Sequence, residues 1–300
     1  MTYVLLDSGG GRKLERIGPY TVDRQAPVAH WKPRLDAAHW KRADAFHVRS
    51  EKGGGHWDLR RELPESWEVQ VQDLTLQVKL TPFGHMGIFP EHAGHWGWLR
   101  ELAGGGAGQA LGRAQRAEGE RSQEPPLEVL HLFGYTGASS IACARAGMRV
   151  THVDAAHSIV EWGKANAALG GVLPAPIRWI VDDCATYMRR ELQRARRYQG
   201  VILDPPTYGR GPKGNVFKIE DDLMPLLDQC VELLGDTPRF VLFTCHTPGF
   251  TPLVLENLLA ERLPRAGAVI ESGEMTLAEE RGGRLLPAGA FARWSAPARG

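Results

Sequence analysis

The sequence predicts an α/β protein in which a small β-rich module precedes a doubly wound, seven-stranded, mostly parallel sheet. Two patterns lead to this prediction. Before residue 103, several stretches alternate apolar and polar residues one by one, which is typical of half-buried strands. From residue 127 onward, short apolar runs alternate with helical stretches, and such alternation gives right-handed crossovers and a parallel sheet covered on both faces. At 300 residues the chain is long enough for both parts.

The N-terminal module is predicted over residues 1–102. Its clearest strands are Trp67–Gln72 and Leu74–Leu80, where every second residue is apolar. Six of the nine tryptophans lie in this module, and tryptophans in a small β domain belong more often to the core than to a binding surface. Residues 103–126 are rich in Gly, Ala, Arg, Glu and Gln without an apolar face, and they are predicted to be a linker.

The second domain is predicted over residues 127–300. Its strands are expected at residues 129–132, 149–153, 177–181, 201–203 and 240–243, and its helices near 138–146, 157–169, 185–198 and 220–235. Val269–Glu271 and Phe291–Trp294, on either side of a Gly282–Gly283 turn, are expected to close one edge as an antiparallel pair.

Composition excludes several classes of protein. The four cysteines are far apart and form no CxxC pair, which argues against a zinc site or a disulfide scaffold and fits a reducing cytoplasm. No apolar run approaches the roughly 20 residues that span a bilayer, and the N-terminus has no signal-peptide pattern, so we expect a cytoplasmic protein without membrane contact. A net charge of +1 gives no global nucleic-acid signature, so any RNA contact has to come from a local patch.

Glycines and acidic residues follow four consecutive predicted strands. The first strand leads into Phe133–Gly137, whose two glycines permit a tight turn and a close approach of the backbone to a ligand. The next three strands end at Asp154, at Asp182–Asp183 and at Asp204. In open α/β sheets a ligand binds at the carboxyl ends of the strands, so these residues are the candidate site.

The spacing of this site favours S-adenosylmethionine over a dinucleotide. A dinucleotide fold requires GxGxxG, whereas this loop has GxxG with Tyr135 in place of the second glycine. Further carboxylates at the third and fourth strands would repel a diphosphate. S-adenosylmethionine carries no phosphate and offers hydroxyl, amino, ammonium and sulfonium groups, which suit several aspartates in charge and in hydrogen bonding.

Four segments in order carry a family resemblance over residues 127–250. They read VLHLFGYTGASSIACARAG, THVDAAHSIVEWGKANAALGG, IRWIVDDCATYMRR and GVILDPPTYGRG. They resemble motifs I to IV of the class I S-adenosylmethionine-dependent methyltransferases, in particular the bacterial group related to 23S rRNA cytosine-5 methyltransferases. The earlier segment GHMGIFPEHAGHWGW resembles the part of such proteins that packs over the methionine end of the cofactor.

The resemblance implies a role for each matching position. Gly134 and Gly137 form the cofactor loop, Asp154 binds the ribose hydroxyls, and Asp204 faces the methyl group and the target. Asp154 also stands where it could cap a helix, but its register with the other strand ends favours the ligand role. The residues assigned to the cofactor are Phe89, Phe133, Gly134, Tyr135, Thr136, Gly137, Asp154, Ala155, Asp183 with the backbone of Cys184, and Asp204.

The loop after the fourth strand indicates methyl transfer but does not identify the atom that accepts the methyl group. Amino-group methyltransferases have an aromatic residue directly after Pro-Pro, and many cytosine-5 enzymes have a cysteine there, whereas this chain has Pro205-Pro206-Thr207-Tyr208. Tyr208 can stack on a base, worth about 1–3 kcal/mol, or be an ordinary loop tyrosine.

Cys245 is the candidate nucleophile. Cytosine C5 is methylated only after a thiolate adds at C6, with Asp204 assisting at N3. Thr244-Cys245-His246 resembles the Thr-Cys-Ser element of cytosine-5 RNA methyltransferases, with His246 in the serine position. The alternative is a buried cysteine that serves only packing.

We therefore predict an S-adenosylmethionine-dependent methyltransferase that acts on an RNA base, with rRNA as the expected partner. No metal is expected, because His85, His92 and His95 lack a completing carboxylate or cysteine pattern. Four alternatives stay open: methylation of a nucleobase nitrogen, methylation of a protein or small molecule, a non-catalytic cofactor-binding RNA-associated module, and a nicotinamide-dependent enzyme. The oligomeric state is not predicted.

Overall fold

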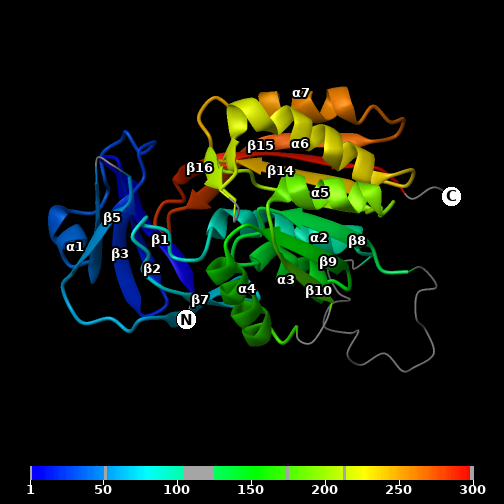
Figure 1. The fold of residues 1–300 in the computed structure, drawn as a ribbon. Helices are drawn as coiled ribbons and strands as arrows, with labels where there is room; N and C mark the ends of the chain where they lie inside the picture. Colours follow the sequence, from blue (N-terminus) through cyan, green and yellow to red (C-terminus); the bar gives the residue numbers. More distant parts are fainter. Residues whose placement is uncertain (1, 51–52, 105–124, 173–175, 212–213, 298–300) are drawn as a thin grey trace. The chain divides into compact units, whose positions relative to one another are not determined.

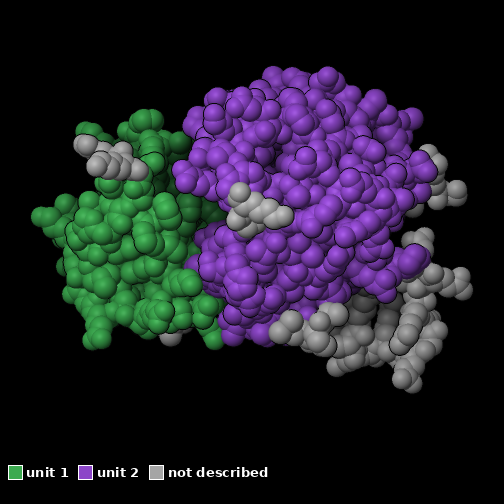
Figure 2. Space-filling model, viewed as in Figure 1, with its two compact units in different colours: residues 1–93, 276–288 green, residues 94–275, 289–300 purple. Residues whose placement is uncertain are grey.

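The computed structural model describes residues 2–50, 53–104, 125–172, 176–211 and 214–297. The chain divides into two compact units (Figure 2): unit 1 consists of residues 1–93 and 276–288, and unit 2 of residues 94–275 and 289–300. Among the described residues, no helix is long and apolar enough to cross a membrane.

Unit 1 is built on a five-stranded sheet (Figure 1). Its strands lie in chain order: β1 (Tyr3–Gly9), β2 (Arg12–Ile17), β3 (Tyr20–Gln25), β4 (Ala45–Arg49) and β5 (Gly55–Leu59). Neighbouring strands are antiparallel except for β3 and β4. β6 (Trp67–Val71) and β7 (Leu74–Val78) form a separate antiparallel pair, α1 spans Ala37–Lys41, and a 3-10 helix spans Pro90–His95.

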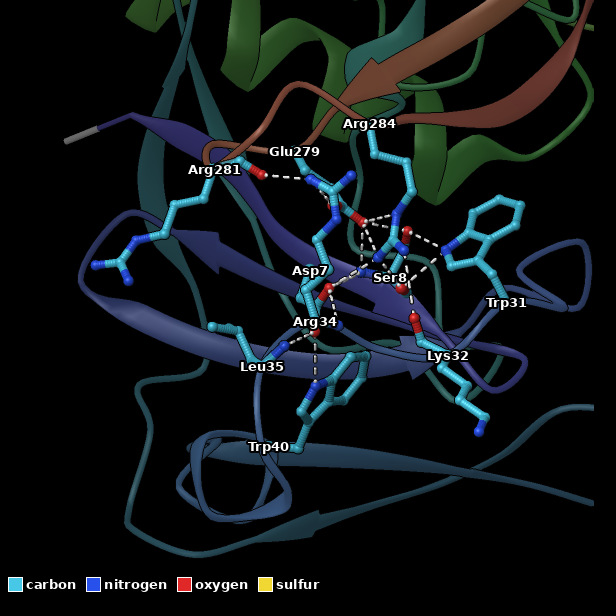
Figure 3. A network of polar contacts seen from close by, with 10 residues as sticks. All are labelled: Asp7, Ser8, Trp31, Lys32, Arg34, Leu35, Trp40, Glu279, Arg281 and Arg284. Carbon is cyan, nitrogen blue, oxygen red and sulfur yellow. Dashed lines mark hydrogen bonds and ion pairs between the residues drawn. The ribbon is translucent and has the colours of Figure 1, made fainter.

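Residues 276–288, near the end of the chain, complete unit 1. Leu277 packs with Leu5 of β1 in a small apolar core. Arg284 anchors the segment, because its guanidinium donates hydrogen bonds to Asp7 at 3.1 Å and to a backbone carbonyl of β1 at 2.6 Å (Figure 3). The predicted division, which placed all residues after 126 in one domain, therefore differs from the compact units.

A buried ion cluster joins β2 and β3. Both oxygens of Glu15 accept hydrogen bonds from Arg24, at 2.6 and 2.7 Å, and Glu15 also accepts one from the Tyr3 hydroxyl. Burial by itself would raise the pKa of Glu15, but the charges of Arg24 and Lys13 and these hydrogen bonds outweigh it and lower the pKa to about 2. Glu15 is therefore ionised in the folded protein.

Unit 2 contains a seven-stranded sheet in the order β10-β9-β8-β11-β14-β16-β15. Its strands are β8 (Glu128–Leu132), β9 (Arg149–Asp154), β10 (Ile177–Val181), β11 (Gly200–Leu203), β14 (Phe240–Cys245), β15 (Val269–Ala278) and β16 (Leu285–Ser295). The first five are parallel and β16 is antiparallel to β14. The chain runs outward from β8 to β10 and returns to β11 on the other side of β8, so the strand order reverses between β8 and β11.

Helices cover both faces of this sheet (Figure 1). On one face lie α2 (Trp96–Leu102), α3 (Ala138–Arg145) and α4 (His157–Leu169), and on the other α5 (Cys184–Gln193), α6 (Ile219–Leu234) and α7 (Pro252–Arg262). The main core fills the space between the sheet and α5 to α7. A short antiparallel pair, β12 (Tyr208–Arg210) and β13 (Val216–Lys218), connects β11 to α6.

This architecture confirms the predicted fold class. The five parallel strands and the four helices are present at the predicted places. Unit 1 ends at Ala93 rather than at residue 102, because Trp96 of α2 is buried in unit 2 and donates a hydrogen bond to Ser139 of α3 at 3.2 Å. Most of the predicted linker, 103–126, lies outside the described residues.

Arg24→Met should destabilise unit 1 by about 3–5 kcal/mol, because it leaves the buried Glu15 charge without its main partner. The double variant Glu15→Gln/Arg24→Met removes both charges and should be closer to wild type in its free energy of unfolding. Since the pKa of Glu15 is lowered in the folded state, its stabilising effect is present above the ordinary value of 4.5 and is lost as pH falls toward about 2. Urea unfolding, followed by tryptophan fluorescence, measures the stability of each variant and its dependence on pH. Equal stability of Arg24→Met and wild type would contradict this account of the Glu15–Arg24 pair.

Candidate functional site

The predicted site residues of unit 2 meet at one edge of the sheet. Leu203 of β11 lies opposite Leu132 of β8 on one side and Phe243 of β14 on the other, so β8 and β11 end at the same level and β14 continues to Cys245. Val181 at the end of β10 lies opposite Asp154 at the end of β9. The loops that follow these strands therefore share the edge at which the strand order reverses, which is where ligands bind in sheets of this kind.

The loop after β8 is a strained turn. Phe133 and Tyr135 have φ of 54° and 50°, and Gly137, which precedes α3, has φ of 82°. A left-handed backbone at a residue with a bulky side chain costs on the order of 1–3 kcal/mol, and such strain concentrates at ligand sites. Asn166 of α4 holds the turn by donating a hydrogen bond to the Thr136 carbonyl at 2.9 Å.

Gly134 lies directly against a buried histidine. A Cβ at this position would come within 2.4 Å of the His152 ring, so no other residue fits without displacement. Below the loop, His131 and His152 both hydrogen-bond the Ser140 hydroxyl, at 2.6 and 3.0 Å. Burial, and then the neighbouring His131, lower the pKa of His152 well below its ordinary value, so its ring is neutral.

Asp154 is bound to the backbone of two loops. Its Oδ2 accepts a hydrogen bond from the Tyr135 N–H and its Oδ1 one from the Ala156 N–H, both at 3.0 Å. Helix α4 is capped by Ala156, so the alternative role of Asp154 as the helix cap is wrong. Burial raises the pKa of this carboxyl above 3.8, and the backbone hydrogen bonds partly offset that increase. Ala155 lies between Asp154 and Ala156 in the loop after β9 and is partly exposed.

The structure separates the roles of Asp182 and Asp183. Asp182 is ion-paired with Arg190 of α5, whereas Asp183 caps α5 by accepting a hydrogen bond from the Thr186 N–H at 2.8 Å. Asp183 also lines a cavity of about 350 Å³. Cys184, the first residue of α5, is buried and accepts a hydrogen bond from the Phe133 N–H through its sulfur.

The loop after β11 is rigid at its base and exposed at its tip. Pro205 is buried and Pro206 is partly buried, whereas Tyr208 begins the β12–β13 hairpin and is 50% exposed. The Thr207 hydroxyl is 2.7 Å from that of Thr247, which ties this loop to the one after β14.

Asp204 and His246 face each other across neighbouring strand ends. Asp204 Oδ2 is 3.5 Å from His246 Nε2, and both side chains are partly exposed. The carboxylate is therefore accessible at the reversal of strand order and stands beside a group that can donate a hydrogen bond. Sequence reasoning placed Asp204 here but gave no role to His246.

The surroundings of Cys245 favour a neutral thiol. Cys245 is 1% exposed and belongs to the main core. Burial raises its pKa and the nearby Asp204 carboxylate raises it further, while hydrogen bonds with Thr247 act in the opposite direction without outweighing burial. Reactive cysteines have lowered pKa values and positive surroundings, so the predicted nucleophile stays a prediction that this environment does not support.

Two phenylalanines remain to be placed, Phe89, which was predicted, and Phe217, which was not. Phe89, predicted to contact the cofactor, belongs to unit 1, where its ring lies 5.3 Å from that of His85. Phe217 of β13 was not predicted. It is 9% exposed and its ring lies 5.1 Å from that of Phe133, next to the cofactor loop. Two apolar residues, Val216 and Phe217, between polar neighbours were too weak a signal to find it.

The fold and this edge define the class: an open, doubly wound α/β protein with a glycine turn and acidic strand ends at the reversal of strand order. No family model matches the chain. The crystal structure of the SAM-dependent methyltransferase from Agrobacterium tumefaciens is 34% identical, covers 99% of this chain and is itself covered to 91%, with a TM-score of 0.87. The chain belongs to the S-adenosylmethionine-dependent methyltransferases.

Two further proteins are similar to this chain. A SAM-dependent methyltransferase from Streptococcus mutans has the same fold, with a TM-score of 0.72, 16% identity, and coverage of 98% of this chain and 75% of that one. The ribosomal RNA large subunit methyltransferase K/L of Shewanella baltica is 29% identical over 167 residues, which are 55% of this chain and 20% of that protein. The chain thus spans about a fifth of the length of the curated relatives it matches. The family assignment confirms the predicted enzyme class and cofactor.

Gly134→Ala should lower the free energy of unfolding by about 1–3 kcal/mol, because the added methyl group overlaps the buried His152 ring. Gly97→Ala is the matched control, since it lies in α2 with nothing within 4 Å of the added Cβ and should be neutral or stabilising by about 0.5–1 kcal/mol. Urea unfolding of both variants is the measurement, and a Gly134→Ala protein as stable as Gly97→Ala would contradict the packing described.

Proposed function

We propose that this methyltransferase transfers a methyl group from S-adenosylmethionine to a nitrogen of an RNA base, and that ribosomal RNA is its substrate. The observation that carries the proposal is the sequence of groups after β11: an accessible Asp204, a rigid Pro205-Pro206 turn, and the half-exposed Tyr208. Such a ring can stack on an unpaired base, and the carboxylate can receive its amino group. The rRNA methyltransferase relatives support RNA as the substrate class, and with a ribosomal substrate the enzyme is proposed to act in the cytoplasm.

The residues at the strand ends fit the cofactor. Gly134 lets the turn after β8 lie directly against the His152 ring, and Gly137, with φ of 82°, leads from this turn into α3. A carboxylate has about four acceptor positions, and Asp154 uses two of them for backbone N–H groups, so two remain for ribose hydroxyls. Asp183 uses Oδ1 to cap α5 and keeps acceptor capacity for an adenine amino group. S-adenosylmethionine, when bound, supplies an electrophilic methyl group. The role of Phe89 at the cofactor stays a prediction.

Asp204 is the proposed catalytic residue. Its carboxylate would accept a hydrogen bond from the amino group of the base, hold the nitrogen in line with the methyl group, and take up the proton that this nitrogen loses. His246 Nε2, 3.5 Å from Asp204 Oδ2, would fix the orientation of the carboxylate. The rate enhancement would come mainly from positioning.

Methylation of cytosine C5 is the less supported alternative. It requires Cys245 as a thiolate, whereas this side chain is buried in the core and its pKa is raised by burial. Methylation of a protein or a small molecule fits the same fold and would label no RNA, and a non-catalytic module would bind the cofactor and label nothing.

Asp204→Asn should reduce methyl transfer by about 10²–10⁴-fold with cofactor affinity retained, because it removes the proton acceptor. Cys245→Ala should keep activity within a few-fold of wild type. Transfer of tritiated methyl groups to rRNA, to protein and to metabolite pools, followed by nucleoside analysis, measures both variants.

Three outcomes of this experiment are decisive. Loss of activity in Cys245→Ala together with 5-methylcytidine as product would overturn the proposed mechanism. Labelling of protein or metabolites alone would overturn RNA as the substrate. An absence of labelling by a wild-type protein that binds S-adenosylmethionine would favour the non-catalytic module.

Asp154→Asn should weaken S-adenosylmethionine binding by about 10- to 100-fold, since hydrogen bonds to a charged acceptor contribute about 1.5–3 kcal/mol. Because burial raises the pKa of Asp154, wild-type affinity should begin to fall at a higher pH than for an ordinary carboxyl, as the carboxylate becomes protonated. Asp236→Asn, an exposed carboxylate before β14, is the control. Calorimetric titration measures the affinities, and an unchanged Asp154→Asn affinity would remove Asp154 from the cofactor site.

A further inference from the structure

Unit 1 contains a cavity of its own, of about 340 Å³. Its walls come from β2, β3 and β4 and from residues 83–91, all within unit 1. The residues on which the argument depends are Lys13, Arg24, Arg49, Phe83 and Glu91. Phe89, one of the residues predicted to contact the cofactor, also lines this cavity, whereas no residue of the proposed catalytic loop of unit 2 does.

The cavity is bordered by positive charge. Arg24 is buried and bound to Glu15, and the Lys13 ammonium lies 3.1 Å from the same carboxylate. Arg49, at the end of β4, is exposed and makes no ion pair within the part of the chain that the structure describes. Glu15 and Glu91 together offset two of these three cations, so Arg49 is the positive charge at the rim that suits a phosphate group.

A buried carboxylate in the same cavity calls for a hydrogen-bond donor. Glu91 is 8% exposed, and its Oε2 has no hydrogen-bond partner among the described residues. Buried polar atoms are almost always hydrogen-bonded, since a buried atom without a partner loses its hydrogen bonds to water and gains none in return. A ligand N–H group would satisfy this oxygen.

An exposed aromatic ring completes the set. Phe83 is 70% exposed, although it lines the cavity. Gly54 lies beside it, and a Cβ there would come within 3.7 Å of the Phe83 ring. An exposed phenylalanine next to cations is the arrangement with which proteins stack and hold single-stranded nucleic acid. The tryptophans of unit 1 do not supply this surface, since Trp31, Trp40, Trp57 and Trp67 each donate their indole N–H within the unit.

We propose that this cavity binds one unpaired nucleotide of an RNA substrate, with the base stacked on Phe83, a base N–H group donating to Glu91, and a phosphate at Arg49. The proposal rests on the proposed function, because it assumes that RNA is the acceptor. It assigns unit 1 a direct contact with the substrate, in addition to the site in unit 2.

Binding of a fluorescein-labelled, unstructured ten-nucleotide RNA to the full chain, measured by fluorescence anisotropy over a series of salt concentrations, tests the proposal. Phe83→Ala should weaken binding by about 5- to 100-fold through loss of stacking. Arg49→Ala should weaken it and reduce the salt slope by about one. Leu59→Ala and Lys41→Ala, an exposed apolar residue and an exposed cation elsewhere in unit 1, are the matched controls and should bind as wild type does.

Glu91→Gln separates a binding role from a structural one. The substitution removes a buried charge, so the thermal midpoint should stay equal or rise, while RNA affinity falls several-fold. A fall in the midpoint with unchanged affinity would assign Glu91 to stability alone and overturn its role in binding.

The outcomes also distinguish this proposal from the proposed function. If wild type methylates RNA and the Phe83 and Arg49 variants bind the probe as the controls do, the cavity proposal fails and the function stands. If wild type neither binds the probe nor methylates RNA, the function fails. If guanosine monophosphate binds with the same dependence on Arg49 while the RNA probe does not bind, the ligand is a free nucleotide and the RNA assignment is overturned.

Discussion

The hydrogen-bonded register of five parallel strands is the constraint on which the site in unit 2 depends. Leu132, Leu203 and Phe243 lie opposite one another, so the residues that follow them are brought to one edge without any contact of their own. The loops are then tied to each other at a few points, such as the Asp154 carboxylate between two backbone N–H groups and the Thr207–Thr247 hydroxyl pair. A strained turn after β8 persists because the packing around it, above all His152 against Gly134, leaves no relaxed alternative.

Unit 1 combines buried apolar residues, such as Ile17, Val22 and Val78, with buried charges. Its small cluster around Leu5 and Leu277 is supplemented by two buried polar assemblies, one at Glu15 and one at Asp7. Paired buried charges add little net stability but penalise every arrangement that separates them. This explains why a segment more than 270 residues away in the sequence, carrying Arg284, returns to a defined place on β1.

Sequence reasoning found what short-range patterns encode. Alternating strands and helices predicted the sheet, and the position of acids at strand ends predicted Asp154, Asp183 and Asp204 as one group. Prediction from the sequence failed where a residue's position depends on contacts with residues that are distant in the chain. The return of residues 276–288 to unit 1 depends on partners near the N-terminus. Phe217 depends on a hairpin with no alternating pattern, and the distinct roles of Asp182 and Asp183 depend on Arg190, which only the folded helix brings near.

The position of Cys245 along β14 determines which face of the sheet its side chain occupies. Side chains alternate between the two faces of a strand, and Val241 and Phe243 of β14 both belong to the core beneath α5 to α7. Cys245 has the same parity and belongs to the same core, whereas His246 follows the strand and reaches Asp204. The residue type suggested a nucleophile, but its register directs it to packing. The acid after β11 and the histidine after β14 lie 3.5 Å apart at the edge where the acids after β9 and β10 also lie, and this polar edge supports the proposed chemistry by proton acceptance and positioning over covalent attack.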